Sequence, residues 1–104
     1  MPRSIFLVAW EFQVRRGAEP RFEEIYGSAG LWAKLFASDP AYLRTELQRD
    51  LRHPGRYLTL DYWISESAYD QFHASHAAAY EAMDRQCEEL TEREALVGRF
   101  VMIP

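Results

Sequence analysis

The sequence predicts an α+β fold in which two helices cover one face of a four-stranded antiparallel sheet. Three observations lead to this prediction. The chain has 104 residues, which is enough for one hydrophobic core and leaves no room for a second. Its composition, 48% hydrophobic and 27% charged residues, is typical of a globular protein. Hydrophobic periodicity gives the order strand, helix, strand, strand, helix, strand, so we expect residues 1–104 to form a single domain.

The first strand is predicted at residues 5–14, because large apolar side chains alternate along one face: Phe6, Val8, Trp10, Phe12 and Val14. The other face is apolar only in the first half of the strand, so we expect that half to be covered on both sides. Glu11 lies on this second face. It is either a site carboxylate with a raised pKa or, as we favour, an edge residue that reaches solvent.

The first helix is predicted to begin near Pro20, which suits the first turn of a helix. Apolar residues then recur at spacings of three and four as far as Phe36. Gly27 and Gly30 each weaken a helix by about 1 kcal/mol relative to alanine. We interpret them as a kink, or as a place where a ligand or the backbone comes close.

The second and third strands are predicted at residues 43–49 and 56–64, joined by a turn that contains Pro54 and Gly55. Alternation sorts the side chains of the third strand onto two faces. One face carries Leu58, Leu60, Tyr62 and Ile64, and the other carries Tyr57, Thr59, Asp61 and Trp63.

The second helix is predicted at residues 66–90, with Ser65 as its N-cap. The segment 75–76 is a place where it can divide into two helices in series. Residues 66–94 carry eight acidic residues against two basic ones, which we interpret as a solvated outer face. The last strand is predicted at residues 95–103. The apolar stripe of the helix, at spacings of three and four, consists of Tyr69, Phe72, His76, Tyr80, Met83, Cys87 and Leu90.

This order of elements is the split βαβ pattern of the ferredoxin-like fold. Two helices cover only one face of such a sheet. We expect the uncovered face to carry Tyr57 and Trp63, together with one apolar set from the first strand. Because an exposed apolar sheet face usually binds a partner, the sequence predicts a homodimer in which two sheets pack face to face.

The net charge of −4 argues against a nucleic-acid partner, because phosphate binding needs clustered positive charge. No apolar run approaches the ~20 residues of a membrane-spanning helix, and the apolar stretch after the N-terminus is too short for a secretory signal. We therefore expect a cytoplasmic protein without a membrane partner. Cys87, the only cysteine, is expected to be buried and inert. Phosphate-binding, zinc-protease and nucleophile-elbow motifs are missing, so we expect neither a metal nor a cofactor.

Fifteen aromatic rings are many for one small core: three Trp, six Phe and six Tyr. Either some of them line a cavity or a subunit interface, or the core is simply rich in aromatic residues. The sequence leaves both interpretations open.

His76 is the candidate for proton transfer. It shares a helix face with Tyr69 and Tyr80, and partial burial there favours a neutral imidazole that accepts a proton from a phenol. The alternative is a core histidine that bonds to a backbone carbonyl or to a tyrosine hydroxyl. His53 and His73 are expected at the surface.

A set of segments spread over nearly the whole chain carries a family resemblance: residues 10–12, 26–36, 39–42, 45–47 and 54–57, and Trp63 with Ser65, Tyr69, Phe72 and His76. These segments resemble the antibiotic biosynthesis monooxygenase domain family of small bacterial proteins. The resemblance implies a ferredoxin-like protomer that pairs through its sheet into a dimeric α/β barrel. It also implies one of several activities: cofactor-independent oxidation of polycyclic phenols to quinones, quinol oxygenation or haem degradation.

The chain departs from the haem-degrading branch of this family at three places. Those proteins place a tryptophan where Phe72 stands, an iron-ligating histidine near the position of Ala82, and an asparagine near the position of Glu11. These departures argue against haem degradation here.

The resemblance and the aromatic surplus together lead to the hypothesis of a cofactor-independent monooxygenase that acts on a small phenolic or polycyclic aromatic substrate. In this hypothesis His76, assisted by Tyr80, removes the phenolic proton. The alternatives are a dimeric barrel that binds a small apolar ligand without a reaction, and a haem-binding protein. The pocket is expected between the helices and the sheet, with the substrate held by Trp10, Trp32, Phe36, Tyr69 and Phe72.

Overall fold

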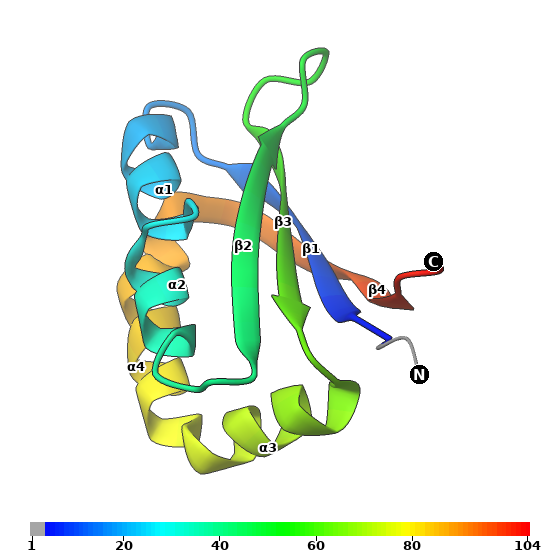
Figure 1. Ribbon diagram of the computed structural model, residues 1–104. Coiled ribbons are helices and arrows are strands. Elements are labelled where there is room, and N and C mark those ends of the chain that lie inside the picture. Colours follow the sequence, from blue (N-terminus) through cyan, green and yellow to red (C-terminus); the bar gives the residue numbers. More distant parts are fainter. Residues whose placement is uncertain (1–3) are drawn as a thin grey trace.

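Four antiparallel strands form the sheet of the computed structural model, which describes residues 4–104. Their order across the sheet is β2-β3-β1-β4, so β3 and β1 are the central strands (Figure 1). This topology confirms the predicted α+β, ferredoxin-like fold. The strands are β1 (Phe6–Val14), β2 (Tyr42–Arg49), β3 (Arg56–Trp63) and β4 (Thr91–Val101).

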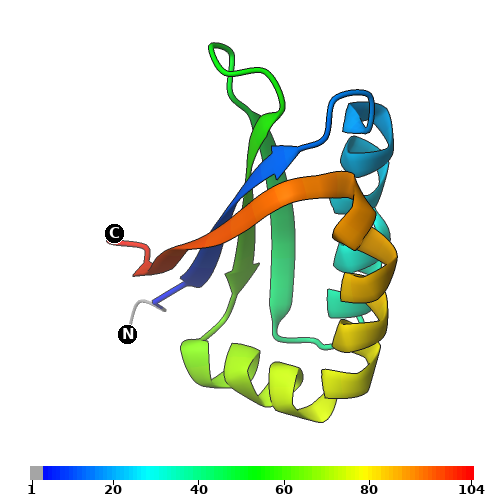
Figure 2. The ribbon, with the colours of Figure 1, turned by 180° about the vertical axis from the view of Figure 1, so that it is seen from behind.

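The helices lie on one side of this sheet, as Figure 1 and Figure 2 show from opposite directions. In both views α1, α2 and α4 form a column beside the sheet, whereas α3 lies across the end at which β3 finishes. Side chains of α3 therefore reach the layer between the column and the sheet from its end. The helices are α1 (Glu19–Tyr26), α2 (Leu31–Phe36), α3 (Glu66–Ser75) and α4 (Ala77–Cys87), with a 3-10 turn, η1, at Glu88–Leu90.

Two glycines divide the first predicted helix into α1 and α2. Gly27 follows α1 and Gly30 precedes α2. A side chain at Gly30 would overlap the carbonyl oxygen of Ile25, so the close approach that we expected at these glycines is made by the backbone. The turn between the helices then directs Trp32 and Phe36 of α2 into the core.

The second predicted helix is interrupted at His76, which the sequence named as one of two options. Ser65 caps the first part, because its Oγ accepts a hydrogen bond from the backbone N–H of Ala68 at 3.1 Å. His76 lies between α3 and α4 with φ −120° and ψ 26°, outside helical geometry. The two helices therefore differ in direction.

The last strand begins at Thr91, four residues before its predicted start, and α4 already ends at Cys87. The reason is the length of β1. Val14 pairs with Thr91, and the N–H of Arg15 donates to the carbonyl of Leu90 at 2.9 Å, which extends the ladder to the end of β1.

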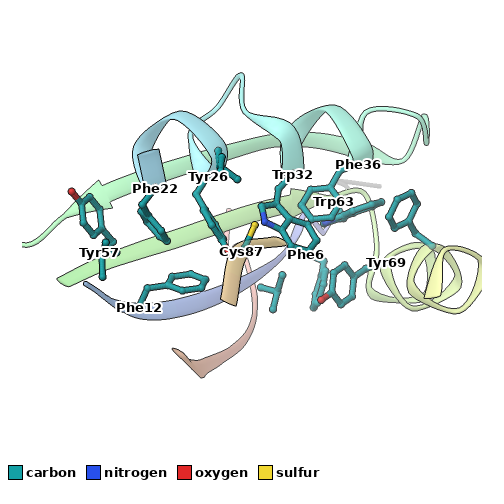
Figure 3. Close-up of a cluster of buried hydrophobic side chains, with 14 of the residues drawn as sticks. Phe6, Phe12, Phe22, Tyr26, Trp32, Phe36, Tyr57, Trp63, Tyr69 and Cys87 are labelled. Carbon is teal, nitrogen blue, oxygen red and sulfur yellow. The ribbon is translucent and has the colours of Figure 1, made fainter. Parts of the chain in front are cut away.

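Aromatic rings make up most of the core between the helices and the sheet (Figure 3). Tyr57 and Trp63 belong to it, with 2% and 0% of their surface exposed, so the expectation that they lie on the uncovered face is wrong. Both faces of β3 are apolar in sequence. The pairing with β1 decides between them, because it sets Tyr57 beside Phe12 and Trp63 beside Phe6 and so forms one continuous aromatic face for the helices.

No helix within the described part of the chain covers the opposite face of the sheet, and we call it the open sheet face. Strand pairing places the side chains of β1, β3 and β4 together on it, among them Leu7, Leu60, Tyr62 and Phe100. Leu7 and Leu60 are partly exposed, and Phe100 is 47% exposed. The predicted apolar face therefore exists, but β3 contributes its other set of side chains to it.

Cys87 is buried, as the sequence predicted. None of the helices within residues 4–104 has the length and the apolar character that a membrane crossing requires.

Candidate functional site

A cavity of about 230 Å³ lies between the helices and the sheet, and every strand and every α-helix contributes to its lining. Its floor is formed by short side chains on the central part of the sheet, Thr45, Thr59 and Asp61. Thr59 and Asp61 lie between the large rings of Tyr57 and Trp63 on the same face of β3. Because their side chains are shorter than these rings, they leave space above the sheet.

The walls of the cavity are aromatic. Trp32 is central to them, because its ring centroid lies 5.1 Å from that of Tyr80, 5.9 Å from that of Phe36 and 6.1 Å from that of Tyr26. Such tilted contacts are favourable and hold the rings in place. The aromatic lining consists of Trp10, Phe12, Tyr26, Trp32, Phe36, Tyr69 and Tyr80.

Asp61 is the one carboxylate on the floor of this cavity, and only 8% of its surface is exposed. Its Oδ1 accepts a hydrogen bond of 2.6 Å from the hydroxyl of Thr45. Because that hydroxyl has one proton to give, the contact of 2.7 Å between Tyr42 and Thr45 has Tyr42 as its donor. Among the described residues, none donates a hydrogen bond to Oδ2 of Asp61.

Burial raises the pKa of Asp61 from its ordinary value of 3.8 to about 6, although the hydrogen bond from Thr45 opposes this rise. The carboxylate is therefore ionised at neutral pH and is a stronger base than an exposed aspartate. Within an aromatic cavity, an ionised carboxylate with one oxygen free of protein donors is suited to accept a proton from a bound molecule.

A histidine–tyrosine pair borders the same cavity. His73 Nε2 and the hydroxyl of Tyr69 are 2.7 Å apart, and the imidazole stacks on Tyr80 with ring centroids 3.9 Å apart. Burial lowers the pKa of His73 and raises that of Tyr69 to about 12, and the charge of Asp61 adds to the second shift. His73 was expected at the surface. It is half-buried and faces the cavity instead.

The structure places His76 outside the cavity lining. Its Nδ1 donates a hydrogen bond of 3.0 Å to the backbone carbonyl of Phe72, and its ring stacks on that of Phe72 at 4.0 Å. The structure thus agrees with the alternative interpretation of His76, a core histidine that bonds to a backbone carbonyl. The break between α3 and α4 explains why His76 does not face the cavity. Because the helix axis changes direction there, the apolar stripe predicted for one continuous helix does not stay on a single face.

Of the expected substrate-binding residues, four line the cavity: Trp10, Trp32, Phe36 and Tyr69. Phe72 does not, because it is 99% buried and packs behind the wall against Phe36. Tyr80, expected to assist catalysis, lies on the wall.

Glu11 does not line the cavity. Its carboxylate accepts a hydrogen bond of 2.9 Å from Nε of Arg56, which lowers its pKa. It points to the open sheet face, since Trp10 and Phe12 on either side of it point to the cavity. The interpretation of Glu11 as a site carboxylate with a raised pKa is therefore wrong.

Sequence reasoning left open whether Asp61 lines the pocket and missed His73 as a site residue, although each had a signal. Asp61 is the only charged residue on a strand face that otherwise carries Tyr57, Thr59 and Trp63. His73 follows Tyr69 by four residues, the spacing that brings two side chains together on a helix. Within residues 4–104, no group of three or more metal-ligating side chains is placed to hold an ion.

Two exposed carboxylates, Asp84 on α4 and Glu94 on β4, border the cavity from its solvent side. They also line an adjoining hollow of about 280 Å³, together with Tyr26 and Cys87. Partial burial raises the pKa of both carboxylates, and the charge of Asp84 raises that of Glu94 further.

Several solved structures share this fold at low sequence identity. A candidate antibiotic biosynthesis monooxygenase from Bordetella bronchiseptica is 18% identical, with a TM-score of 0.75 over 97% of this chain and 99% of that one. SnoaB, a cofactor-independent oxygenase from Streptomyces nogalater, is 22% identical, with a TM-score of 0.66 over 99% and 96%. A candidate monooxygenase from Fusobacterium nucleatum is 13% identical, with a TM-score of 0.70 over 99% of this chain and 45% of that one.

A search of curated proteins finds no match. The structural similarities above establish the fold and nothing finer, because all of them lie below 25% identity. The family model described as antibiotic biosynthesis monooxygenase matches residues 5–85. Since this match spans well over half of the sequence, the chain belongs to the antibiotic biosynthesis monooxygenase family.

Proposed function

We propose that the protein is a cofactor-independent oxygenase that oxidises a phenolic aromatic substrate in the cavity between its helices and its sheet. The observation that carries this proposal is Asp61, a nearly buried carboxylate with one oxygen free of protein donors, on the floor of an aromatic cavity. Family membership and the similarity to a cofactor-independent oxygenase support it.

Each part of the cavity has a role in this reaction. The rings of Trp10, Trp32 and Phe36 hold the flat substrate by stacking and exclude water. Asp61 is the general base, because its pKa of about 6 leaves it ionised at neutral pH and able to take a proton. With the His73 proton on Nε2, His73 donates to the hydroxyl of Tyr69, whose own proton is then available for a substrate oxygen.

The chemistry needs no metal when the substrate forms a stabilised anion, as a hydroxyanthrone does at its CH₂ carbon. Asp61 takes one proton from this carbon, and dioxygen takes one electron from the anion. The two radicals join in a C–O bond, and Asp61 returns its proton to the peroxide. Loss of the second C–H proton then breaks the O–O bond and releases water. In sum, CH₂ and O₂ give C=O and H₂O.

The size of the cavity restricts the substrate. Its volume of about 230 Å³ is below the range of roughly 300–1,000 Å³ that is usual for drug-sized ligands. A compound of two or three fused rings therefore occupies the cavity fully, and any further substituent extends past Asp84 and Glu94 into the adjoining hollow.

The sequence hypothesis gave the role of base to His76, with help from Tyr80, and oxygen uptake with hydroxyanthrones and quinols separates the two assignments. We expect Asp61→Asn to lower kcat by about a hundredfold or more, the usual loss on removing a general base. His76→Gln serves as the matched variant outside the lining, and we expect its kcat to stay within about twofold of the parent.

The pH dependence of the rate is a second test of Asp61 as the base, because a carboxylate must be ionised to accept a proton. We expect kcat/KM of the parent to rise with pH and to level off above the Asp61 pKa of about 6. If His76→Gln loses activity and Asp61→Asn keeps it, the sequence assignment is right and ours is wrong.

A second candidate function is binding of a small apolar ligand without a reaction. The observation that favours it is the hydrogen bond between His76 and the backbone, which leaves that imidazole out of the cavity. Saturable binding of a hydroxyanthrone without oxygen uptake above a protein-free blank would establish this candidate and refute the oxygenase.

We also propose that two copies pair through the open sheet face. The side chains gathered on it, Leu7, Leu60 and Phe100, would gain from burial, as apolar surface does in general. Strand β4 lies at the edge of the sheet, and its Phe100, opposite Leu7, leaves 47% of its surface exposed on this face, which supports a partner there.

A further inference from the structure

The cavity has two chemically different ends. Asp61 on β3 lies opposite Val8 of β1, and Glu94 on β4 lies opposite Phe12 of the same strand. Because Val8 and Phe12 are four residues apart on β1, the two carboxylates are separated by about 13 Å along the strand direction. One end is thus nearly buried, and the other is exposed.

The exposed end is strongly acidic. Asp84 and Glu94 border both the cavity and the adjoining hollow, and the hollow has two more carboxylates in its lining, Glu88 and Glu92. Among residues 4–104, no lysine or arginine lines the cavity, and Arg93 is the one arginine in the lining of the hollow. All eight acidic residues of the segment 66–94 are exposed, which agrees with the solvated face that the sequence predicted. Four of them also line the hollow: Asp84, Glu88, Glu92 and Glu94.

The neighbours of these carboxylates are aromatic. Tyr26 lines both spaces, and Trp32 and Tyr80 line the cavity. Aromatic faces and carboxylates both attract a cation, and partial removal from water strengthens the attraction. Burial raises the pKa of Asp84 and Glu94, and a bound cation would offset this cost by favouring their ionised forms.

We propose that the substrate is a phenolic aromatic compound that carries a basic amine, with its proton-donating group toward Asp61 and the ammonium group between Asp84 and Glu94. This inference rests on the proposed function for the placement of the proton-donating group at Asp61. A substrate with a carboxylate at the same end is disfavoured, because it meets the like charges of Asp84 and Glu94 there.

The inference is tested with three naphthols that differ only in the group at the end remote from the hydroxyl: aminomethyl, hydroxymethyl and carboxymethyl. Their affinities for the full chain are measured by isothermal titration calorimetry at about pH 7, where the amine is charged. We expect the aminomethyl compound to bind about tenfold more tightly than the hydroxymethyl compound, the effect of two partly desolvated ion pairs. The carboxymethyl compound is expected to bind least tightly.

Two variants show whether the named carboxylates cause the preference. We expect Asp84→Asn and Glu94→Gln each to reduce the preference for the amine, and the double variant to remove it, while affinity for the hydroxymethyl compound stays unchanged. Glu24→Gln, on the exposed side of α1 and outside both linings, makes the same change in net charge and is expected to have no effect. This control removes long-range attraction as an explanation.

The failure of this inference is distinguishable from that of the proposed function. Equal affinities for the three naphthols, or a preference that survives in the double variant, would overturn the amine assignment even if hydroxyanthrones are oxidised. A preference for the amine that depends on Asp84 and Glu94, without oxygen uptake by any compound, would support the amine site and refute the oxygenase.

Discussion

At the residue scale, the fold carries a cost at Asp61. An ionised carboxylate is held almost out of water, with one hydrogen bond from Thr45. Burial of a charge is unfavourable unless it is fully paired, which is why the pKa of this group is raised. Active sites often retain such unfavourable groups because the reaction needs them.

The cost predicts how stability depends on pH. The folded state binds the Asp61 proton with a pKa of about 6, against 3.8 for the ordinary group, so it holds more protons than the unfolded state between these values. The contribution of Asp61 to stability is therefore greatest below about pH 4 and is lost as pH rises through about 6. At neutral pH the ionised group destabilises the fold.

We therefore expect Asp61→Asn to raise the free energy of unfolding by about 1–3 kcal/mol at neutral pH, where the ionised carboxylate is costly. Urea denaturation at a series of pH values checks this. The gain is expected to shrink as pH falls from 6 to 4 and to vanish below about pH 3, where Asp61 is protonated in both states. A gain of the same size at every pH would mean that the charge is not its cause. A variant that is more stable than the parent but inactive would show that Asp61 serves catalysis and not the stability of the fold.

At the element scale, the break between α1 and α2 depends on a position that accepts no side chain. Gly30 lies against the carbonyl oxygen of Ile25, and its own carbonyl accepts the bond from Lys34 that begins α2. We expect Gly30→Ala to lower the free energy of unfolding by more than about 2 kcal/mol, because the backbone must shift to accept the Cβ. Ser28→Ala, in the exposed part of the same turn, is the control and is expected to change stability by less than about 0.5 kcal/mol. Equal effects of the two substitutions on urea denaturation would contradict this account.

The elements themselves were largely predictable from the sequence, because periodicity, Pro20, Ser65 and the turn at residues 50–55 are local signals. The faces of β3 were not, since both are apolar and only the pairing of Tyr57 and Trp63 with β1 selects the covered one. The site was predictable in its aromatic walls, but not in its polar groups. The change of direction between α3 and α4 decides that His73 and not His76 reaches the cavity. The helical periodicity of the sequence does not predict this change of direction.

At the scale of the whole molecule, the proposed dimer makes an unpaired charge costly in the apolar part of the open sheet face, around Leu7, Leu60 and Phe100. We expect the parent to be a dimer at micromolar concentration and Phe100→Glu to be a monomer, because a carboxylate in an apolar interface is costly. Sedimentation velocity measures both masses. Leu51→Glu is the matched control, since Leu51 is 96% exposed and lies in the loop between β2 and β3. A monomeric parent, or a monomeric Leu51→Glu variant, would refute the proposed interface.

Strand β4 has β1 on one side, and on its other side no strand formed by residues 4–104. Eleven residues of backbone along this margin offer donors and acceptors to whatever extended chain comes near. A dimer that covers the open sheet face leaves this edge free, so a further extended strand can still add to it by backbone hydrogen bonds.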